Sequence, residues 1–281
     1  MSVRIVTDST SDIPPHMAQA LGISVVPLSV IFGEEAYKEN VEISPDLFYE
    51  RLQKAKDLPT TSAPSVGDFL QTYREVLKET NEIVSIHLSS KLSATYSNAC
   101  QAAAQLNDEG ARIDVVDSKV ISLGMLFLAR ASAKAAAAGA TVDAIKKMIE
   151  GMIPRTHIYV LLDTLEYVRR GGRIGRARAF IGTMMRVKPV LSIRDGEVHP
   201  EERVRTRVHA LDRVFQMATS FPEIEEIGVA YSTNAAEAEG MRRRLQEALG
   251  DKKVEVTRLG PVIGVHGGPG VLGIGILEGE R

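Results

Sequence analysis

Stretches rich in β-branched residues alternate with amphipathic helical stretches along the first half of the chain, and this alternation constrains the fold more than any other feature. Strands and helices that alternate in this way form a mostly parallel sheet covered by helices. Hydrophobic spacing and cap residues predict strands at residues 4–7, 23–32, 83–88 and 111–116, and helices at residues 15–21, 45–54, 66–77, 94–106, 123–138 and 142–152.

The second half also alternates, but it contains a hairpin signal. Arg194-Asp195-Gly196-Glu197 is typical of a turn between residues 191–193 and Val198. We therefore predict α/β architecture throughout: one domain at residues 1–154 with a mostly parallel sheet, a second at residues 155–281 with a mixed sheet, and a ligand cleft or tunnel between them. Further strands are expected at residues 157–162, 227–231, 254–258 and 271–277, and further helices at residues 208–220 and 235–249.

Composition narrows the function classes. The length of 281 residues suits two domains. A net charge of −2 and 5% aromatic residues argue against a nucleic-acid binder. Cys100 is the only cysteine, which excludes an intramolecular disulfide and a cysteine-based zinc site, and the histidine spacing predicts no metal. No apolar signal or membrane-spanning segment is visible, so we expect a cytoplasmic protein.

Hydroxyl-bearing residues follow several of the predicted strands. They occur in residues 7–11, after the first strand, and in residues 89–93, which include Ser93. The carboxyl ends of parallel strands form the ligand crevice of an open α/β sheet, and helix starts there favour anions. These residues are therefore either helix caps or donors to an anionic head group. A second cluster, Thr60, Thr61 and Ser62, lies in a predicted extended loop before the capping box of Ser65 and Asp68.

Glycines gather near the end of the chain, in residues 264–273, around His266. The formal G-x-G-x-x-G at Gly268, Gly270 and Gly273 lacks the following helix and acidic partner of a dinucleotide site. We interpret the run as a tight loop that brings backbone and His266 close to a ligand.

Arginines gather in another stretch, with no acidic residue between Arg169 and Lys188. Such a run forms either a solvated face or a surface for an anionic partner, such as a phosphate or an acidic protein. RNA would fit the charge but lacks supporting aromatic residues. The stretch contains Arg169, Arg170, Arg173, Arg176, Arg178 and Arg186, and Arg203, Arg205 and Arg207 follow it.

Several motifs in order along the chain resemble those of the DegV family. They are residues 6–12 (VTDSTSD), Thr61-Ser62 with Pro64-Ser65, residues 89–96 (SSKLSATY), residues 165–174 (LEYVRRGGRI) and residues 264–270 (GVHGGPG). Lys91 and Ala94 depart from the family pattern, where glycine is common.

The resemblance implies a lipid-binding protein with an EDD-type fold, two α/β domains and no cofactor. A long-chain fatty acid would lie in an apolar tunnel, its carboxylate bound by Thr61 and Ser93 with Ser62 and His266 around them. The protein would be a non-catalytic carrier that presents this carboxylate to a separate ATP-binding fatty acid kinase subunit, in phospholipid metabolism, with transient membrane contact and no nucleic acid. We place kinase docking on Arg169, Arg170, Arg173, Arg205 and Arg207. The candidates for the tunnel wall are Met125, Phe127, Ile181, Met184 and Met185, for which ordinary core packing is the alternative.

Two other classes stay open at this point. One is a hydrolase with Ser93 as nucleophile and His266 as base, which also needs an orienting acid and an oxyanion hole. The other is a sugar- or triose-phosphate enzyme, suggested only by the α/β plan. The residues leave open the acyl length, its saturation and the oligomeric state.

Overall fold

The computed structural model describes residues 2–183 and 187–280, with backbone alone for residues 181–183. The first half forms a parallel four-stranded sheet in the order β2-β1-β6-β7, as the alternation predicts. Its strands are β1 (Arg4–Asp8), β2 (Ile23–Val26), β6 (Glu82–His87) and β7 (Arg112–Asp117).

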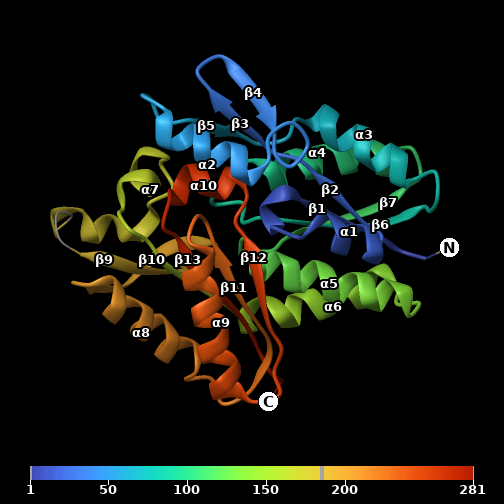
Figure 1. Ribbon diagram of the computed structural model, residues 1–281. Helices are drawn as coiled ribbons and strands as arrows, with labels where there is room; N and C mark the ends of the chain where they lie inside the picture. The colour runs from blue at the N-terminus through green and yellow to red at the C-terminus, as the bar shows by residue number, and fades with distance from the viewer. Residues whose placement is uncertain (1, 184–186, 281) are drawn as a thin grey trace.

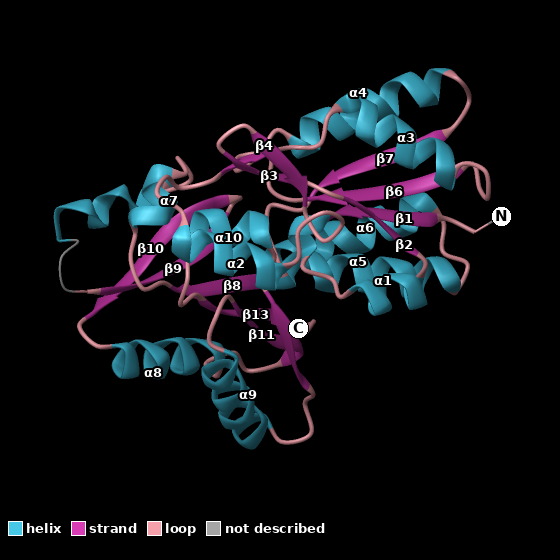
Figure 2. Ribbon diagram, turned by 45° about the horizontal axis from the view of Figure 1, so that its top comes forward, coloured by secondary structure: helices cyan, strands magenta, loops and turns pink. Residues whose placement is uncertain are grey.

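Helices cover both faces of this sheet (Figure 2). On one face, α3 and α4 bury Phe69, Tyr73 and Ala99 against Val6 and Ile83 of the strands. On the other face lie α1, α5 and α6. The bounds are α1 (Pro15–Leu21), α3 (Val66–Val76), α4 (Thr95–Asp108), α5 (Leu123–Ala137) and α6 (Val142–Met152), and α3 begins with the predicted capping box.

The second half forms a mixed six-stranded sheet in the order β10-β9-β8-β13-β11-β12, in which only β11 and β12 run parallel. Helices α8 and α9 cover one face, and the other face turns toward the first half (Figure 1). The predicted hairpin turn joins β9 to β10. The bounds are β8 (Thr156–Leu161), β9 (Lys188–Arg194), β10 (Glu197–Val204), β11 (Ile224–Tyr231), β12 (Val254–Arg258), β13 (Leu272–Glu278), α8 (Arg207–Ala218) and α9 (Ala235–Leu249).

A small antiparallel sheet, in the order β4-β3-β5, is absent from the sequence prediction. The single strand expected at residues 23–32 is wrong, because Pro27 has no backbone N–H and the chain leaves the parallel sheet there. Residues 60–62, expected as a loop, pair with β3 as a strand. The elements here are β3 (Ser29–Phe32), β4 (Glu35–Lys38), β5 (Thr60–Ser62), α2 (Pro45–Lys54) and α10 (Pro261–Gly267).

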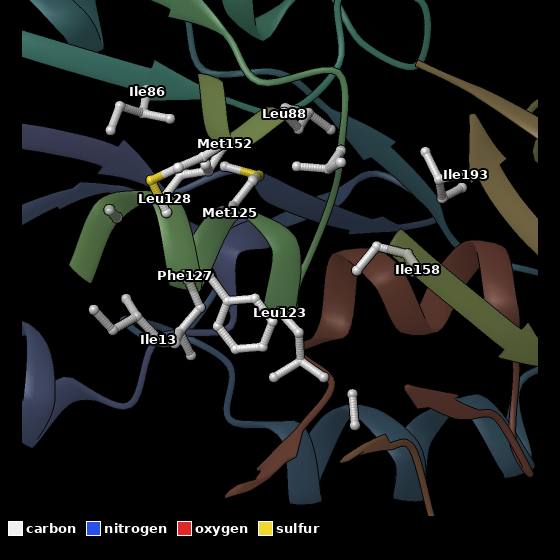
Figure 3. Packing of buried hydrophobic residues seen from close by; sticks show 14 of the residues in the cluster. Ile13, Ile86, Leu88, Leu123, Met125, Phe127, Leu128, Met152, Ile158 and Ile193 are labelled. Carbon is white, nitrogen blue, oxygen red and sulfur yellow. The ribbon is translucent and has the colours of Figure 1, made fainter. Parts of the chain in front are cut away.

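The two halves share one core. Helix α5 packs against β1 and against β13, and one buried cluster joins Leu128 of α5 to Ile158 of β8 and Ile193 of β9 (Figure 3). The boundary near residue 154 stays a prediction. None of the helices in the described part of the chain combines the length and hydropathy that a bilayer span needs. The remaining short elements are the 3-10 helices η1 (Ser9–Ser11), η2 (Ile153–Arg155) and η3 (Gly175–Thr183), and α7 (Glu166–Arg170).

Candidate ligand-binding cavity

A cavity of about 480 Å³ lies between the six-stranded sheet and the elements of the first half. That volume is within the range of small-molecule sites, roughly 300–1,000 Å³. Most of its lining is apolar, and β8, β9, β13, α5 and α10 all contribute to it. Its polar side chains include Thr61, Ser62, Ser93, Asn98, Arg173 and His266. The lining therefore fits a molecule with a polar head and an apolar body.

Two of these polar side chains, Thr61 and His266, contact each other. Thr61 is fixed in β5, where it pairs with Val30 of β3, and its Oγ1 lies 2.9 Å from Nε2 of His266. The other ring nitrogen, Nδ1, is buried and has no hydrogen-bond partner among the described residues. A Cβ at Gly171 would lie 2.2 Å from Nδ1, so only glycine allows this approach. An unpaired N–H would be costly there, which places the ring proton on Nε2.

The electrostatics around His266 favour a neutral ring. Burial, together with the positive charge of Arg173, lowers the pKa of His266 to about 4. The neutral ring donates Nε2–H to Thr61, and the Thr61 hydroxyl hydrogen is then free to bind a ligand. No acidic side chain is hydrogen-bonded to His266 in the described part of the chain.

Ser93 lies at the start of α4. Its Oγ is 2.8 Å from Oγ1 of Thr95 and accepts a hydrogen bond from the Thr95 backbone N–H. Ala94, at the N-cap position, provides no side-chain cap. Apart from the Thr95 N–H, the first turn of this 14-residue helix therefore presents uncapped N–H groups and a positive dipole end, both favourable for an anion.

Two buried carboxyl groups fix the start of α10, and thereby position His266. Asp12 accepts the backbone N–H of Gly260, and Glu39 accepts that of Val262, both at 2.8 Å. Burial raises the pKa of Asp12 well above its usual value and that of Glu39 to about 7. The loop predicted around His266 is thus wrong in part: Pro261 begins a helix, and the turn comes only at Gly268 and Gly270, which have positive φ.

A family model described as an uncharacterised protein of the DegV family matches residues 2–279. Protein DegV of Bacillus subtilis is 35% identical over 281 residues, and a DegV domain-containing protein of Halalkalibacterium halodurans is 37% identical over 276 residues; the alignments cover 98% and 97% of each chain. This chain belongs to the DegV family.

Solved structures of DegV family proteins share the fold. A fatty acid-binding DegV family protein from Thermus thermophilus has a TM-score of 0.90 at 33% identity, and the match covers 99% of this chain and 100% of that one. DegV of Bacillus subtilis, described as a fatty acid binding protein, has a TM-score of 0.90 at 34% identity with the same coverage. A stearic acid-binding protein from Eubacterium ventriosum has a TM-score of 0.91 at 26% identity, with 98% of each chain covered. The predicted family and α/β fold are confirmed.

The two departures from the DegV pattern leave the polar side of the cavity intact. Ala94 has φ −74°, which any residue adopts, and it lines the cavity. The Lys91 Nζ lies 3.4 Å from Glu197, so this side chain links the loop before α4 to the β9–β10 hairpin. Asn98, which the sequence analysis missed, donates to the Pro64 carbonyl at 2.8 Å and fixes the loop after β5.

The arginines expected to act together lie in different surroundings. Arg173 lines the cavity and donates to the carbonyls of Leu92 and Gly171, so its surroundings differ from those of the exposed arginines. Arg169 and Arg170 both pair with Glu166 and remain exposed, and Arg205 is exposed. Arg207 pairs with Glu237 and Asp163. Charge patterning located the cluster but could not show which way each side chain points.

The expected tunnel wall needs correction on α5. Met125 and Phe127 are fully buried in the protein core and do not line the cavity; Met125 lies beside Met152, and Phe127 lies beside Ile13 (Figure 3). Leu123, the first residue of the helix, lines the cavity instead. The Ile181 side chain and residues Met184 and Met185 lie outside what the structure describes.

The hydrolase alternative is not favoured. The hydroxyl of Ser93 bonds to Thr95, His266 bonds to Thr61, and no acid orients the His266 ring within the described residues. A hydrolase would instead need a hydrogen bond between Ser93 and His266 and another between His266 and an acid, and neither is present among the described residues. Nor do any three or more His, Cys, Asp or Glu side chains there form a group able to hold a metal ion.

An Asp–His–Ser arrangement does exist elsewhere, and the sequence analysis missed it. Nδ1 of His87 lies 2.9 Å from Asp8, and Nε2 lies 2.7 Å from Oγ of Ser85, which also accepts the Tyr73 hydroxyl. Asp8, Ser85, His87 and Tyr73 are all fully buried. A substrate cannot reach this network, so its role is structural.

Proposed function

We propose that this protein binds one long-chain fatty acid, with the carboxylate at the Thr61–Ser93 end of the cavity and the acyl chain along the apolar lining. The observation that carries the proposal is that Thr61 and Ser93, whose hydroxyls bond to no acidic group among the described residues, line a mostly apolar cavity. A carboxylate only accepts hydrogen bonds, so hydroxyls with available hydrogens match it. Arg173 and the α4 N-terminus add favourable positive potential.

The acyl chain would supply most of the affinity, since each buried CH₂ contributes about 0.8 kcal/mol. The hydroxyls would then decide which end of the molecule lies where. Fatty acid binding by the solved DegV relatives from Thermus thermophilus and Bacillus subtilis supports this assignment. The protein itself would carry out no chemistry on the ligand.

Mass spectrometry of an organic extract of the purified protein tests the binding function. We expect one fatty acid per chain, or uptake of one equivalent when the protein is delipidated and then given oleate. An extract without lipid, together with no uptake, contradicts the proposal. Turnover of a generic ester that disappears in Ser93→Ala would revive the hydrolase.

We further propose that the bound carboxylate is presented in the cytoplasm to a separate ATP-binding kinase subunit, and that the fatty acid is acquired by transient membrane contact. The sequence holds no P-loop motif, so phosphorylation would need a nucleotide-binding partner. The exposed side chains of Arg169, Arg170 and Arg205 are the docking candidates. Arg207 contributes less, because two carboxylates already neutralise it.

Charge reversal separates docking from ligand binding. In Arg170→Glu with Arg205→Glu, we expect fatty acid affinity within about twofold of wild type and a sharp loss of acyl-phosphate formation by the kinase subunit. The wild-type rate should fall as salt rises, because charge steers the association. Arg243→Glu, an exposed reversal on α9, is the matched control. Kinase activity unchanged by the double reversal contradicts docking at these arginines.

A further inference from the structure

The cavity face of the six-stranded sheet carries two cross-strand rows of residues. The strand register places Ala230 of β11 opposite Gly273 of β13, then Val160 of β8 and Leu191 of β9; this is the first row. The second row is Gly228, Gly275, Ile158 and Ile193 on the same strands. Each row has small residues on β11 and β13 and large ones on β8 and β9, so the sheet surface is lower on the β11–β13 side.

The space above the small residues on β11 and β13 is occupied in one row and open in the other. Over the second row, Leu123 of α5 occupies the space: a Cβ on Gly275 would lie 2.5 Å from the Leu123 Cβ, and one on Gly228 would lie 3.0 Å from its Cδ2. Over the first row, a Cβ on Gly273 would meet nothing nearer than the Tyr159 carbonyl oxygen at 3.6 Å and the Ala230 Cβ at 3.8 Å. Gly273 and Ala230 both line the cavity.

Backbone conformation does not explain the glycine at position 273. Its φ is outside the left-handed region, so any residue could adopt this strand geometry. A glycine inside a strand weakens the strand and often marks the close approach of another group. Since no atom of the described residues lies nearer than 3.6 Å to a Cβ at Gly273, the approaching group would be the ligand.

We propose that Ala230 and Gly273 form the surface on which the acyl chain lies, and that the Leu123 side chain blocks the chain from extending over the second row. These three residues would then set the acyl length that the cavity accepts. This inference rests on the proposed fatty acid function and adds the determinant of chain length. A side chain at position 273 would occupy the path of the acyl chain. A smaller residue at position 123 would open the second row to it.

The test compares dissociation constants for saturated fatty acids of 10 to 20 carbons, measured by displacement of a fluorescent fatty acid. We expect Gly273→Ala to move the preferred length toward shorter chains and to weaken the longest ones about fourfold for each methylene that no longer fits. Leu123→Ala should move the preference the other way, by about two carbons.

Gly240→Ala on α9 is the matched control, because it adds the same methyl group where no atom lies within 4 Å and no cavity residue is involved. It should keep the wild-type length profile. Leu123→Ala removes buried volume, so if it does not fold, Gly273→Ala alone decides the question, since its methyl group fits between protein atoms.

The outcomes separate this inference from the function beneath it. Wild-type protein that binds no fatty acid of any length overturns the proposed function, and the inference with it. Wild-type protein that binds fatty acids while Gly273→Ala keeps the same length profile overturns only the inference. Opposite shifts in Gly273→Ala and Leu123→Ala support it.

Discussion

Two histidines in this protein each bond to a hydroxyl, yet their surroundings differ. His87 contacts Ser85 through Nε2 and the Asp8 carboxylate through Nδ1, all without solvent exposure. His266 contacts Thr61 through Nε2, its Nδ1 is unpaired among the described residues, and it borders the cavity. The network around His87 therefore contains a carboxylate that accepts its hydrogen bonds. The network around His266 has hydrogen-bond donors but no anion to accept from them.

This difference separates a structural polar cluster from a binding one. Within the core, Asp8 accepts hydrogen bonds from the hydroxyl and backbone N–H of Thr10, from the Leu88 N–H and from His87. In the proposed complex, the fatty acid carboxylate would accept from the Thr61 and Ser93 hydroxyls as Asp8 accepts from Thr10. Changes to the first network should therefore affect stability, and changes to the second should affect ligand affinity.

The largest effect is expected from Asp8→Asn. Four donors would lose a charged acceptor inside the core, which should lower the free energy of unfolding by about 3–5 kcal/mol. Urea denaturation of the ligand-free protein measures this. The folded fraction should keep its fatty acid affinity. A loss below about 1 kcal/mol would show that the network is not structural, and the comparison would fail.

A somewhat smaller effect on stability is expected from the protonation of His266 at low pH. Because its pKa falls from 6.5 to about 4 on folding, the unfolded chain binds more protons between these values. This group therefore makes the protein less stable as pH falls from 6.5 to 4, by up to about 3 kcal/mol. In His266→Asn this fall in stability between pH 6.5 and 4 should disappear. Measuring the free energy of unfolding of both proteins across this pH range tests it.

Glu39 contributes the opposite slope, so the variant must be compared with wild type at each pH. The pKa of Glu39 rises from 4.5 to about 7 on folding, so the folded chain binds more protons in that range, and stability falls as pH rises through it. Parallel stability curves for wild type and His266→Asn would contradict a buried, neutral His266.

A third effect is expected on affinity alone. Thr61→Val keeps the shape of the side chain and removes the hydroxyl, which should weaken fatty acid binding about 10- to 100-fold. Thr60→Val is the matched control, because it is the same change at the neighbouring residue, whose side chain is exposed and does not line the cavity; we expect a change below about threefold. Isothermal titration with oleate measures both. Equal losses in the two variants would remove the distinction between Thr61 and its neighbour.

The sequence predicted the two sheets because their strands are β-branched and separated by strong helix signals, and it predicted the hairpin because Asp195-Gly196 favours positive φ. It missed β5 because Thr60-Thr61-Ser62 is short and polar, with no alternation to mark a strand. The Asp8–His87 pair was missed because 79 residues separate its members.

Side-chain direction was the harder part of the site to predict. Residues 123–129 of α5 are buried all round, so no polar face separates Leu123, at the cavity, from Met125 and Phe127, in the core. In the sequence, Arg173 cannot be distinguished from the arginines beside it, because all belong to one basic run. The turn at Gly171-Gly172 directs its side chain to the Leu92 carbonyl. Local pattern located these residues but could not orient them.

A crystal structure of this protein with a stoichiometric saturated fatty acid tests the central claim most directly. We predict carboxylate oxygens within hydrogen-bond distance of the Thr61 and Ser93 hydroxyls, and an acyl chain lying over Ala230 and Gly273. A carboxylate at the apolar end, or a fatty acid bound outside an empty cavity, would contradict it.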